Sequence, residues 1–253
     1  MINNLLAIKS VKKVYEGDIK ALDEVSLEIN PNEIVALLGS SGAGKSTLLK
    51  SIVGLVKLDE GEVLFKNTSV IGKNLKILRN SVATIYQNFN LVVRSSVIKN
   101  IMLGKVSKVS SWRILANIWP REIKLQAISL LTEVGLDSLD LHKRIENLSG
   151  GQQQRIGIAR ALIGSPEIIL ADEPVSNLDP QTAKEILSLL KEKSKENKIS
   201  ILCSLHQVEL AKSFADRIIG MKDGRIVFNK LTKNLSEKDL NMIYKNKIDY
   251  YDK

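Results

Sequence analysis

The stretch from Gly39 to Thr47 constrains what this chain can fold into more than any other segment. It follows an apolar run that is typical of a buried strand, Ile34 to Leu38, and it leads into a helical pattern. A strand, a glycine-rich turn and a helix N-terminus in this order form a phosphate loop, in which backbone N–H groups and the helix dipole face an anion. The plainer interpretation, a glycine turn before an ordinary helix, explains neither the full spacing nor both flanks. The sequence therefore predicts a nucleotide-phosphate site.

The residue types of this loop suit separate tasks. Its glycines allow the backbone to turn inward toward an anion. Lys45 is placed to reach the β- and γ-phosphates, and the Ser46 hydroxyl is placed to bind Mg²⁺. The predicted nucleotide-binding residues of the loop are Gly39, Ser40, Ser41, Gly42, Ala43, Gly44, Lys45, Ser46 and Thr47.

Length and composition fit one large or two small domains that bury a sizeable core. The chain has 253 residues, of which 44% are apolar, yet no apolar stretch is long enough to span a membrane. Its first residues lack the features of a signal peptide. The single cysteine, Cys203, lies in an apolar run, where we expect it to pack as a small hydrophobe. These features predict a cytosolic protein.

The formal net charge of +9 allows three interpretations. A solvated, lysine-rich surface ranks first, because the lysines are scattered and aromatic residues make up only 4% of the chain. An anionic membrane surface ranks second, and nucleic acid ranks third. We therefore expect no nucleic-acid partner.

Short strands flank the phosphate loop. Leu5 to Val11 and the alternating segment that ends at Ile29 predict an antiparallel pair before it. Tyr15 lies between them, and core packing and stacking on an adenine ring are equally compatible with its position. Further strands are expected over Gly61 to Lys66, Ser81 to Tyr86, Ile168 to Glu173 and Ile199 to Leu205, with a hairpin turn at Asp223-Gly224. A short terminal helix is expected after Lys230.

From about Leu91 to Gly164 the pattern changes to helices, as in a subdomain inserted into an α/β core. Ser95 or Ser96 is placed to cap the first helix. A basic, apolar insert with Trp112 and Trp119 follows, and these two side chains either pack within the block or meet a partner.

A second candidate anion site lies inside this block. Ser149, Gly150, Gly151 and Gln152 come just before a helix, as at an anion-binding helix N-terminus. One nucleotide rarely needs two such sites. A simple helix cap is the alternative.

Polar residues end several of the predicted strands. Asp172 is placed to hold Mg²⁺, and Glu173 to orient and deprotonate an attacking water, which makes this pair after a complete phosphate loop a strong signal. Gln87 and His206 also end strands, where a loop-capping amide and a structural histidine are the better interpretations from position alone. Asp179 precedes Pro180 as a helix cap.

In this order the motifs resemble the ATP-binding subunit of ABC transporters, and the resemblance covers nearly all of the chain. The segment Leu148-Ser149-Gly150-Gly151-Gln152 is similar to the signature motif of that family, which is highly specific. The resemblance implies a P-loop NTPase with a RecA-like α/β core, an antiparallel β subdomain and an inserted α-helical subdomain. The implied boundaries are 1–90 and 165–230 for the core with its β subdomain, about 91–164 for the helical subdomain, and 231–253 for a tail.

The resemblance also implies roles for residues that position alone leaves open. It makes Tyr15 the adenine-stacking residue, Gln87 a Mg²⁺ and coupling residue, and His206 the γ-phosphate sensor. It pairs two copies head to tail, so that Ser149 and Gly151 of one close on the γ-phosphate bound at Lys45 of the other, with Asp179 contacting across the dimer. ATP and Mg²⁺ are then the cofactors.

A finer resemblance concerns the phosphonate-import branch of the family. It is carried by Ser204 to Ala211, Phe214 to Ile218, Ala171 to Pro180 and the insert that ends at Trp119 to Glu122. It implies ATP hydrolysis that drives uptake of phosphonate or a related oxyanion through membrane permease subunits, with an extracytoplasmic solute-binding protein as an indirect partner. The chain would then lie at the cytoplasmic face of the cell membrane as a peripheral subunit.

Two other functions compete with this one. Another ABC importer, for instance for a polar amino acid, would carry the same motifs. A soluble ABC ATPase acting on nucleic acid or ribosomes is disfavoured, because the chain has one phosphate loop and no heptad run.

Overall fold

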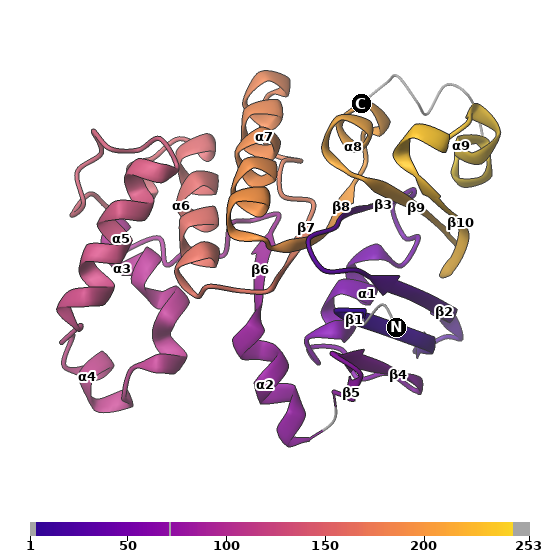
Figure 1. Cartoon of the computed structure of the whole chain (residues 1–253), viewed down its shortest axis with the longest axis horizontal. Helices are drawn as coiled ribbons and strands as arrows, with labels where there is room; N and C mark the ends of the chain where they lie inside the picture. The colour runs from indigo at the N-terminus through magenta and orange to yellow at the C-terminus, as the bar shows by residue number, and fades with distance from the viewer. Residues whose placement is uncertain (1–3, 71, 245–253) are drawn as a thin grey trace.

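A six-stranded sheet forms the centre of the computed structural model, which describes residues 4–70 and 72–244 (Figure 1). From one edge to the other, its strands are β6 (Val82–Tyr86), β7 (Ile168–Asp172), β8 (Ser200–Leu205), β3 (Ile34–Leu38), β9 (Arg217–Lys222) and β10 (Arg225–Leu231). The first five strands in this order are parallel, and β10 pairs with β9 in the antiparallel direction.

A second, antiparallel sheet lies beside the first. It has the order β2 (Ile19–Ile29), β1 (Leu6–Tyr15), β4 (Glu60–Phe65) and β5 (Thr68–Ser69). It packs with α1 (Lys45–Ile52), the helix that follows the phosphate loop, in one hydrophobic cluster.

The remaining helices separate into two groups in Figure 1. Those between β6 and β7 gather at one end of the molecule, and they are α3 (Val97–Met102), η1 (Leu103–Lys108), α4 (Ser111–Leu115), α5 (Arg121–Glu133), η2 (Ile145–Asn147) and α6 (Gly150–Ile163). The others lie on or beside the main sheet, and they are α2 (Lys73–Ser81), α7 (Pro180–Asn197), α8 (Val208–Phe214), η3 (Thr232–Asn234) and α9 (Glu237–Ile243). No helix among the described residues is long and apolar enough to cross a bilayer.

The central strands are apolar on both faces because each face is covered. In β3, Ile34, Ala36 and Leu38 belong to the cluster formed with the helices, whereas Val35 and Leu37 belong to the cluster formed with the antiparallel sheet. This alternation follows from the two-residue period of a strand.

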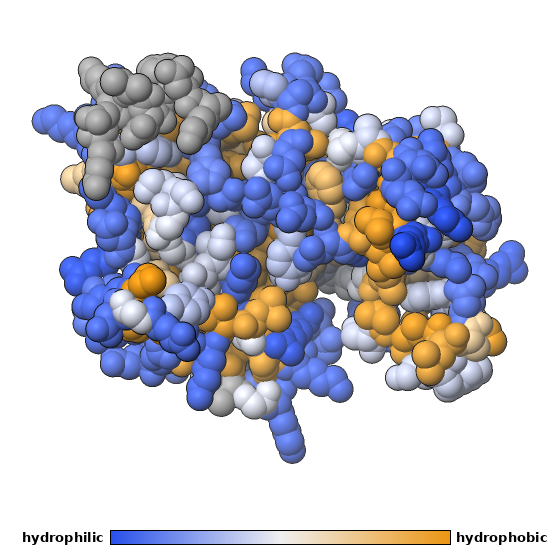
Figure 2. All heavy atoms as spheres, turned by 180° about the vertical axis from the view of Figure 1, so that it is seen from behind, coloured by the Kyte–Doolittle hydropathy of each residue, from blue (hydrophilic) through white to orange (hydrophobic). Residues whose placement is uncertain are grey.

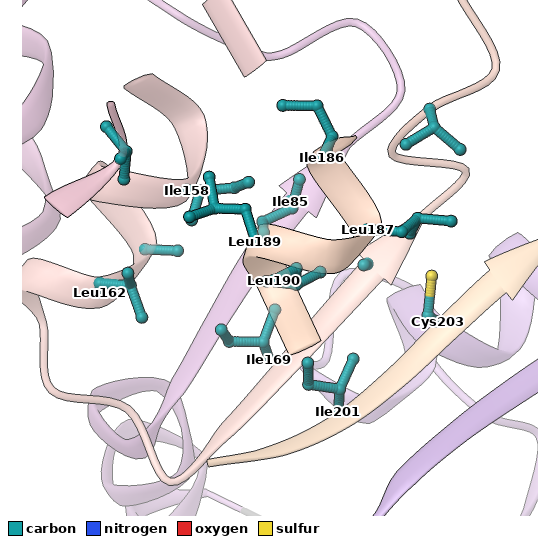
Figure 3. Packing of buried hydrophobic residues seen from close by; sticks show 14 of the residues in the cluster. Ile85, Ile158, Leu162, Ile169, Ile186, Leu187, Leu189, Leu190, Ile201 and Cys203 are labelled. Carbon is teal, nitrogen blue, oxygen red and sulfur yellow. The ribbon is translucent and has the colours of Figure 1, made fainter. Parts of the chain in front are cut away.

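Figure 3 shows how α7 closes the helical side of the sheet. Leu190 of α7 lies near Ile169 and Ile201 of the strands, and Leu189 lies toward Ile158 of α6. Cys203 lies fully buried in the same layer, as expected, and its burial raises the pKa of the thiol. Burial of this kind makes a cysteine an inert packing residue.

The predicted α/β P-loop fold is confirmed. The predicted strands are present, although β1 extends to Tyr15, β7 ends at Asp172 instead of Glu173, and β5 is not predicted by the sequence. The expectation that the side chain of Ser95 or Ser96 caps the first helix of the helical block is wrong. Ser96 occupies the cap position of α3, but its buried hydroxyl has no hydrogen-bond partner, because Val97 N and Ile98 N donate to the carbonyls of Lys143 and Leu141 instead. Helices α2, α4 and α8 were not anticipated from the sequence.

Candidate nucleotide-binding site

The carboxyl ends of four parallel strands bring the predicted site residues to one edge of the sheet. The register aligns Tyr86 with Asp172 and Asp172 with Ser204, while Leu38 lies opposite Leu205. Gln87, Glu173, His206 and the phosphate loop therefore leave the sheet at neighbouring positions. This edge is where ligands bind in open α/β sheets.

The phosphate loop wraps around its own lysine. Lys45 is 4% exposed, and its Nζ donates to the carbonyls of Gly39 and Ser40 at 2.8 and 3.1 Å. Burial lowers the pKa of Lys45, although Glu173 and Asp172 act in the opposite direction. Gly44 has φ +99°, and a Cβ there would lie 2.3 Å from the Ala21 carbonyl oxygen, so only glycine fits. The loop thus holds a cation ready for an anion.

Ser46 and Asp172 form the core of the expected metal site. Ser46 Oγ donates to Asp172 Oδ1 at 2.8 Å, and Ser204 Oγ donates to the same oxygen at 2.8 Å. Two oxygen donors with few other protein ligands fit Mg²⁺, which keeps several waters and takes phosphate oxygens. No cluster of three or more His, Cys, Asp or Glu side chains among the described residues offers a protein-only metal cage.

Glu173 and His206 contact each other directly. His206 Nε2 lies 2.5 Å from Glu173 Oε1, and this hydrogen bond is the main reason that the pKa of Glu173 is lowered. Glu173 has φ +48°, a conformation that costs a residue with a side chain some energy, and its N–H donates to Ser204 Oγ at 2.9 Å. The structure thus holds an ionised carboxylate next to an imidazole at the edge of the sheet.

Gln87 is exposed and directly follows β6, and its carbonyl accepts from Asn177 Nδ2 at 3.4 Å. The loop that follows is held by the helical group. Arg160 of α6 donates to the carbonyls of Asn90 and Phe89 at 2.6 and 2.8 Å, and the buried Asn100 of α3 bonds both main-chain groups of Val92. These hydrogen bonds tie the chain after Gln87 to α6 and α3.

The second anion-type site forms the N-terminus of α6. Ser149 and Gln152 make a reciprocal capping box, and Ser149 is exposed. Gly151 permits a close approach, since a Cβ there would lie 2.9 Å from Thr182 Cγ2 of α7. Across the residues that the structure describes, no hydrogen bond or ion pair connects any of residues 149–152 with the phosphate loop. The two candidate anion sites are separate within one chain.

Tyr15 and Asp179 lie at the surface. Tyr15 ends β1 with 42% exposure, in the hairpin whose second strand, β2, reaches the phosphate loop at Ala21. Asp179 caps α7 by accepting from Thr182 N at 3.0 Å, and hydrogen bonds from Thr182 lower its pKa.

Sequence reasoning missed two residues that contact the site. One is Arg160, whose carbonyl partners become visible only in three dimensions. The other is Tyr244, whose hydroxyl donates to the carbonyl of His206 at 3.0 Å and ties the end of α9 to the site. No sequence spacing signals either contact, because the partners are 70 and 38 residues apart.

Comparisons with known proteins agree with this geometry. Residues 22–176 match the family model described as ABC transporter. The chain is 43% identical to the phosphonates import ATP-binding protein of Hyphomonas neptunium, over 92% of this chain and 89% of that protein. It is 42% identical to the protein of the same name from Treponema denticola, over 93% of each.

Solved structures show the same fold. A dimeric ATP-binding cassette in a post-hydrolysis state with ADP and Pi is 34% identical and has a TM-score of 0.79, over 91% of this chain and 100% of that one. A transporter subunit from Clostridium perfringens is 28% identical and has a TM-score of 0.80, over 95% of this chain and 94% of that one. The chain therefore belongs to the ABC transporter family, as one of its ATP-hydrolysing subunits.

Proposed function

We propose that the chain energises the import of phosphonate or a related phosphorus oxyanion through separate membrane subunits, as a peripheral subunit at the cytoplasmic face of the cell membrane. The observation that carries this proposal is the similarity, at 42–43% identity and over nearly the whole length, to proteins named for phosphonates import. The solute is read by other chains, and this chain supplies the free energy of ATP hydrolysis. An extracytoplasmic solute-binding protein would be its indirect partner.

In the proposed site, Lys45 and the backbone of the loop hold the phosphates, and Tyr15 stacks on the adenine. Ser46, Asp172 and Gln87 would hold Mg²⁺, which would neutralise charge on the β- and γ-phosphates. Glu173 orients and deprotonates the attacking water, and His206 contacts the γ-phosphate. The contact between Ser46 and Asp172 and that between Glu173 and His206 support these roles.

We further propose that two copies pair head to tail around ATP. The exposed cap at Ser149, which does not reach the phosphate loop of its own chain, supports this arrangement, as do the similar structures described as dimeric. Ser149, Gly150, Gly151 and Gln152 would then complete the partner's site, with Asp179 next to it. We also propose the subdomain boundaries expected from the sequence, which are 1–90 and 165–230 for the core with its β subdomain, about 91–164 for the helical subdomain and 231–253 for the tail.

Substitution of Ser149 by Arg tests the head-to-tail site. The bulky side chain at the start of α6 should keep the partner's γ-phosphate away, so ATP hydrolysis should fall at least about tenfold while the monomer still binds ATP. The control is Ser188→Arg, an exposed serine of α7. Hydrolysis at the wild-type rate by Ser149→Arg together with the membrane subunits would exclude this site.

The membrane subunit is proposed to dock beside the loop after Gln87. A cavity of about 320 Å³ opens there, between the free edge of β6 and the helical group, and its wall includes Tyr86, Asn90 and Arg160. Val92 and Val93 lie in the same loop and are 50% and 53% exposed. Exposed apolar side chains favour an interface with another protein. Because these two lie in the loop after the proposed nucleotide-sensing Gln87, such an interface would transmit a movement of that loop to the membrane subunit.

Replacing both Val92 and Val93 by Asp should prevent co-purification with the membrane subunits. ATP binding should stay within about twofold of wild type, because the site residues are untouched. The matched control is the pair Val227→Asp and Leu231→Asp, exposed apolar residues of β10. If the chain with Asp at 92 and 93 assembles and is stimulated normally, the docking face lies elsewhere.

The proposed solute is tested with the complete transporter in vesicles. ATP hydrolysis should rise when the solute-binding protein is loaded with a phosphonate and should stay at its basal rate with a polar amino acid. Stimulation by the amino acid alone would establish the competing importer. A chain that hydrolyses no ATP under either condition would contradict the site itself.

A further inference from the structure

The positive charge of this chain is concentrated in one segment. Residues 63–121 contain ten Lys or Arg and no Asp or Glu, while the rest of the sequence holds the other 27 Lys or Arg against all 28 acidic residues. The whole excess of +9 therefore arises from this segment. The interpretation of scattered, solvated lysines does not account for such a distribution.

The fold gathers much of this segment along one side of the molecule. Helices α2 and α4 of this segment lie along the lower edge of the molecule in Figure 1. Of the ten cations, only Lys66 has a carboxylate partner within the described part of the chain, and that partner is Glu167. Among the described residues the other nine form no ion pair, although Glu122 acts electrostatically on Lys105. An unneutralised surface of this size raises the local concentration of anions.

Large apolar side chains protrude from the same side. Trp112, Leu115 and Ile118 are 60%, 88% and 52% exposed, and Figure 2 shows apolar atoms gathered over the end of the molecule where α4 lies. Trp119 is only 8% exposed and anchors the insert in the core. The Arg113 guanidinium lies 5.4 Å from the Trp112 ring. The tip of the insert, residues 112–118, thus presents a tryptophan and two aliphatic side chains next to a cation.

We propose that this face, α2 together with η1, α4 and the loop to Trp119, binds the anionic headgroups of a phospholipid bilayer directly. Cations near the surface attract such headgroups, and exposed tryptophan and aliphatic side chains enter the boundary between headgroups and acyl chains. Arg79 and Lys108 line the cavity proposed for the membrane subunit. Lys73, Lys76 and Arg113 lie outside its wall on two separate helices, α2 and α4, which fits a planar surface better than a folded protein partner. Nucleic acid fits less well, since Trp112 is the one exposed tryptophan or phenylalanine of the described segment.

The consequence is a chain that finds and orients itself on the membrane before it meets its membrane subunits. The inference rests on the surface of this chain and holds whichever solute is imported. It goes beyond the proposed peripheral location, because it assigns membrane contact to this chain itself.

The test uses the purified full chain without membrane subunits. Vesicles of phosphatidylcholine with phosphatidylglycerol should bind it, vesicles of phosphatidylcholine alone should bind it at least about tenfold more weakly, and high salt should release it. In a Trp119→Phe variant, which leaves Trp112 as the single tryptophan, binding should shift the emission to the blue. That shift reports insertion of the tip, which adsorption by charge alone would not produce.

Charge reversal locates the face. Lys76→Glu on α2 with Arg113→Glu on α4 should weaken binding to the anionic vesicles at least about tenfold. Lys184→Glu with Lys195→Glu on α7 changes the net charge equally and should alter binding no more than about twofold. Thermal melting of each variant confirms folding. Equal losses in both pairs, an unshifted Trp112 emission, or association only with vesicles that contain the membrane subunits would each overturn the proposal, and none of these results would bear on ATP hydrolysis.

Discussion

Glu173→Gln should abolish ATP turnover while leaving ATP binding intact. Glutamine keeps the size of the side chain but cannot accept a proton from water. Removal of a general base typically costs a factor of about 10² to 10⁴ in rate, so we expect a loss of at least about a hundredfold. The rate of phosphate release under saturating ATP measures it, and size exclusion should show the variant accumulating as an ATP-bound dimer.

The geometry gives this prediction its physical basis. The hydrogen bond from His206 holds the pKa of Glu173 below its ordinary range, which keeps the carboxylate ionised and also makes it a weaker base. If His206 turned to the γ-phosphate, as proposed, release of that hydrogen bond would restore the basicity of Glu173. The proposed sensor and the proposed base are therefore coupled through one contact.

A matched control separates this role from a general loss of charge. Glu209→Gln changes an exposed glutamate of α8 that forms an ion pair with Lys212, and it should hydrolyse ATP as the wild type does. If Glu173→Gln retained turnover within a few-fold of wild type, the general base would have to be another group.

Much of the site could be predicted because strands place their ends predictably. Each of Gln87, Glu173 and His206 follows a strand whose apolar run is plain in the sequence, and parallel strands end at one edge. Position alone could not rank Gln87 and His206 above structural alternatives. Their roles were suggested by the family resemblance, and they remain proposals.

What could not be predicted depends on packing between distant segments. Trp112 and Trp119 lie in the same insert, yet one is exposed and the other is buried, because the chain between them turns at the end of α4. The grip of Arg160 on the loop after Gln87 likewise needs α6 and β6 to be placed together. Short helices such as α8 lack the length that makes a periodic pattern visible.

Lys45→Ala should remove most of the affinity for ATP. Lys45 is proposed to contact the β- and γ-phosphates, and it is buried, so its attraction for phosphate would be poorly screened by water. Hydrogen bonds to charged groups contribute about 1.5–3 kcal/mol each, which predicts a rise in Kd of at least about tenfold. Equilibrium binding of a fluorescent ATP analogue measures the change.

The control for this variant lies on the same helix. Lys50 is exposed in the last turn of α1, so Lys50→Ala removes an equal charge from the protein without touching the loop. Its Kd should stay within about twofold of wild type, since an exposed charge at that distance is screened. If Lys45→Ala and Lys50→Ala bound ATP equally well, the phosphates would not lie in this loop. A selective loss in Lys45→Ala would show that burial and direction, and not net charge, make Lys45 the phosphate-binding cation.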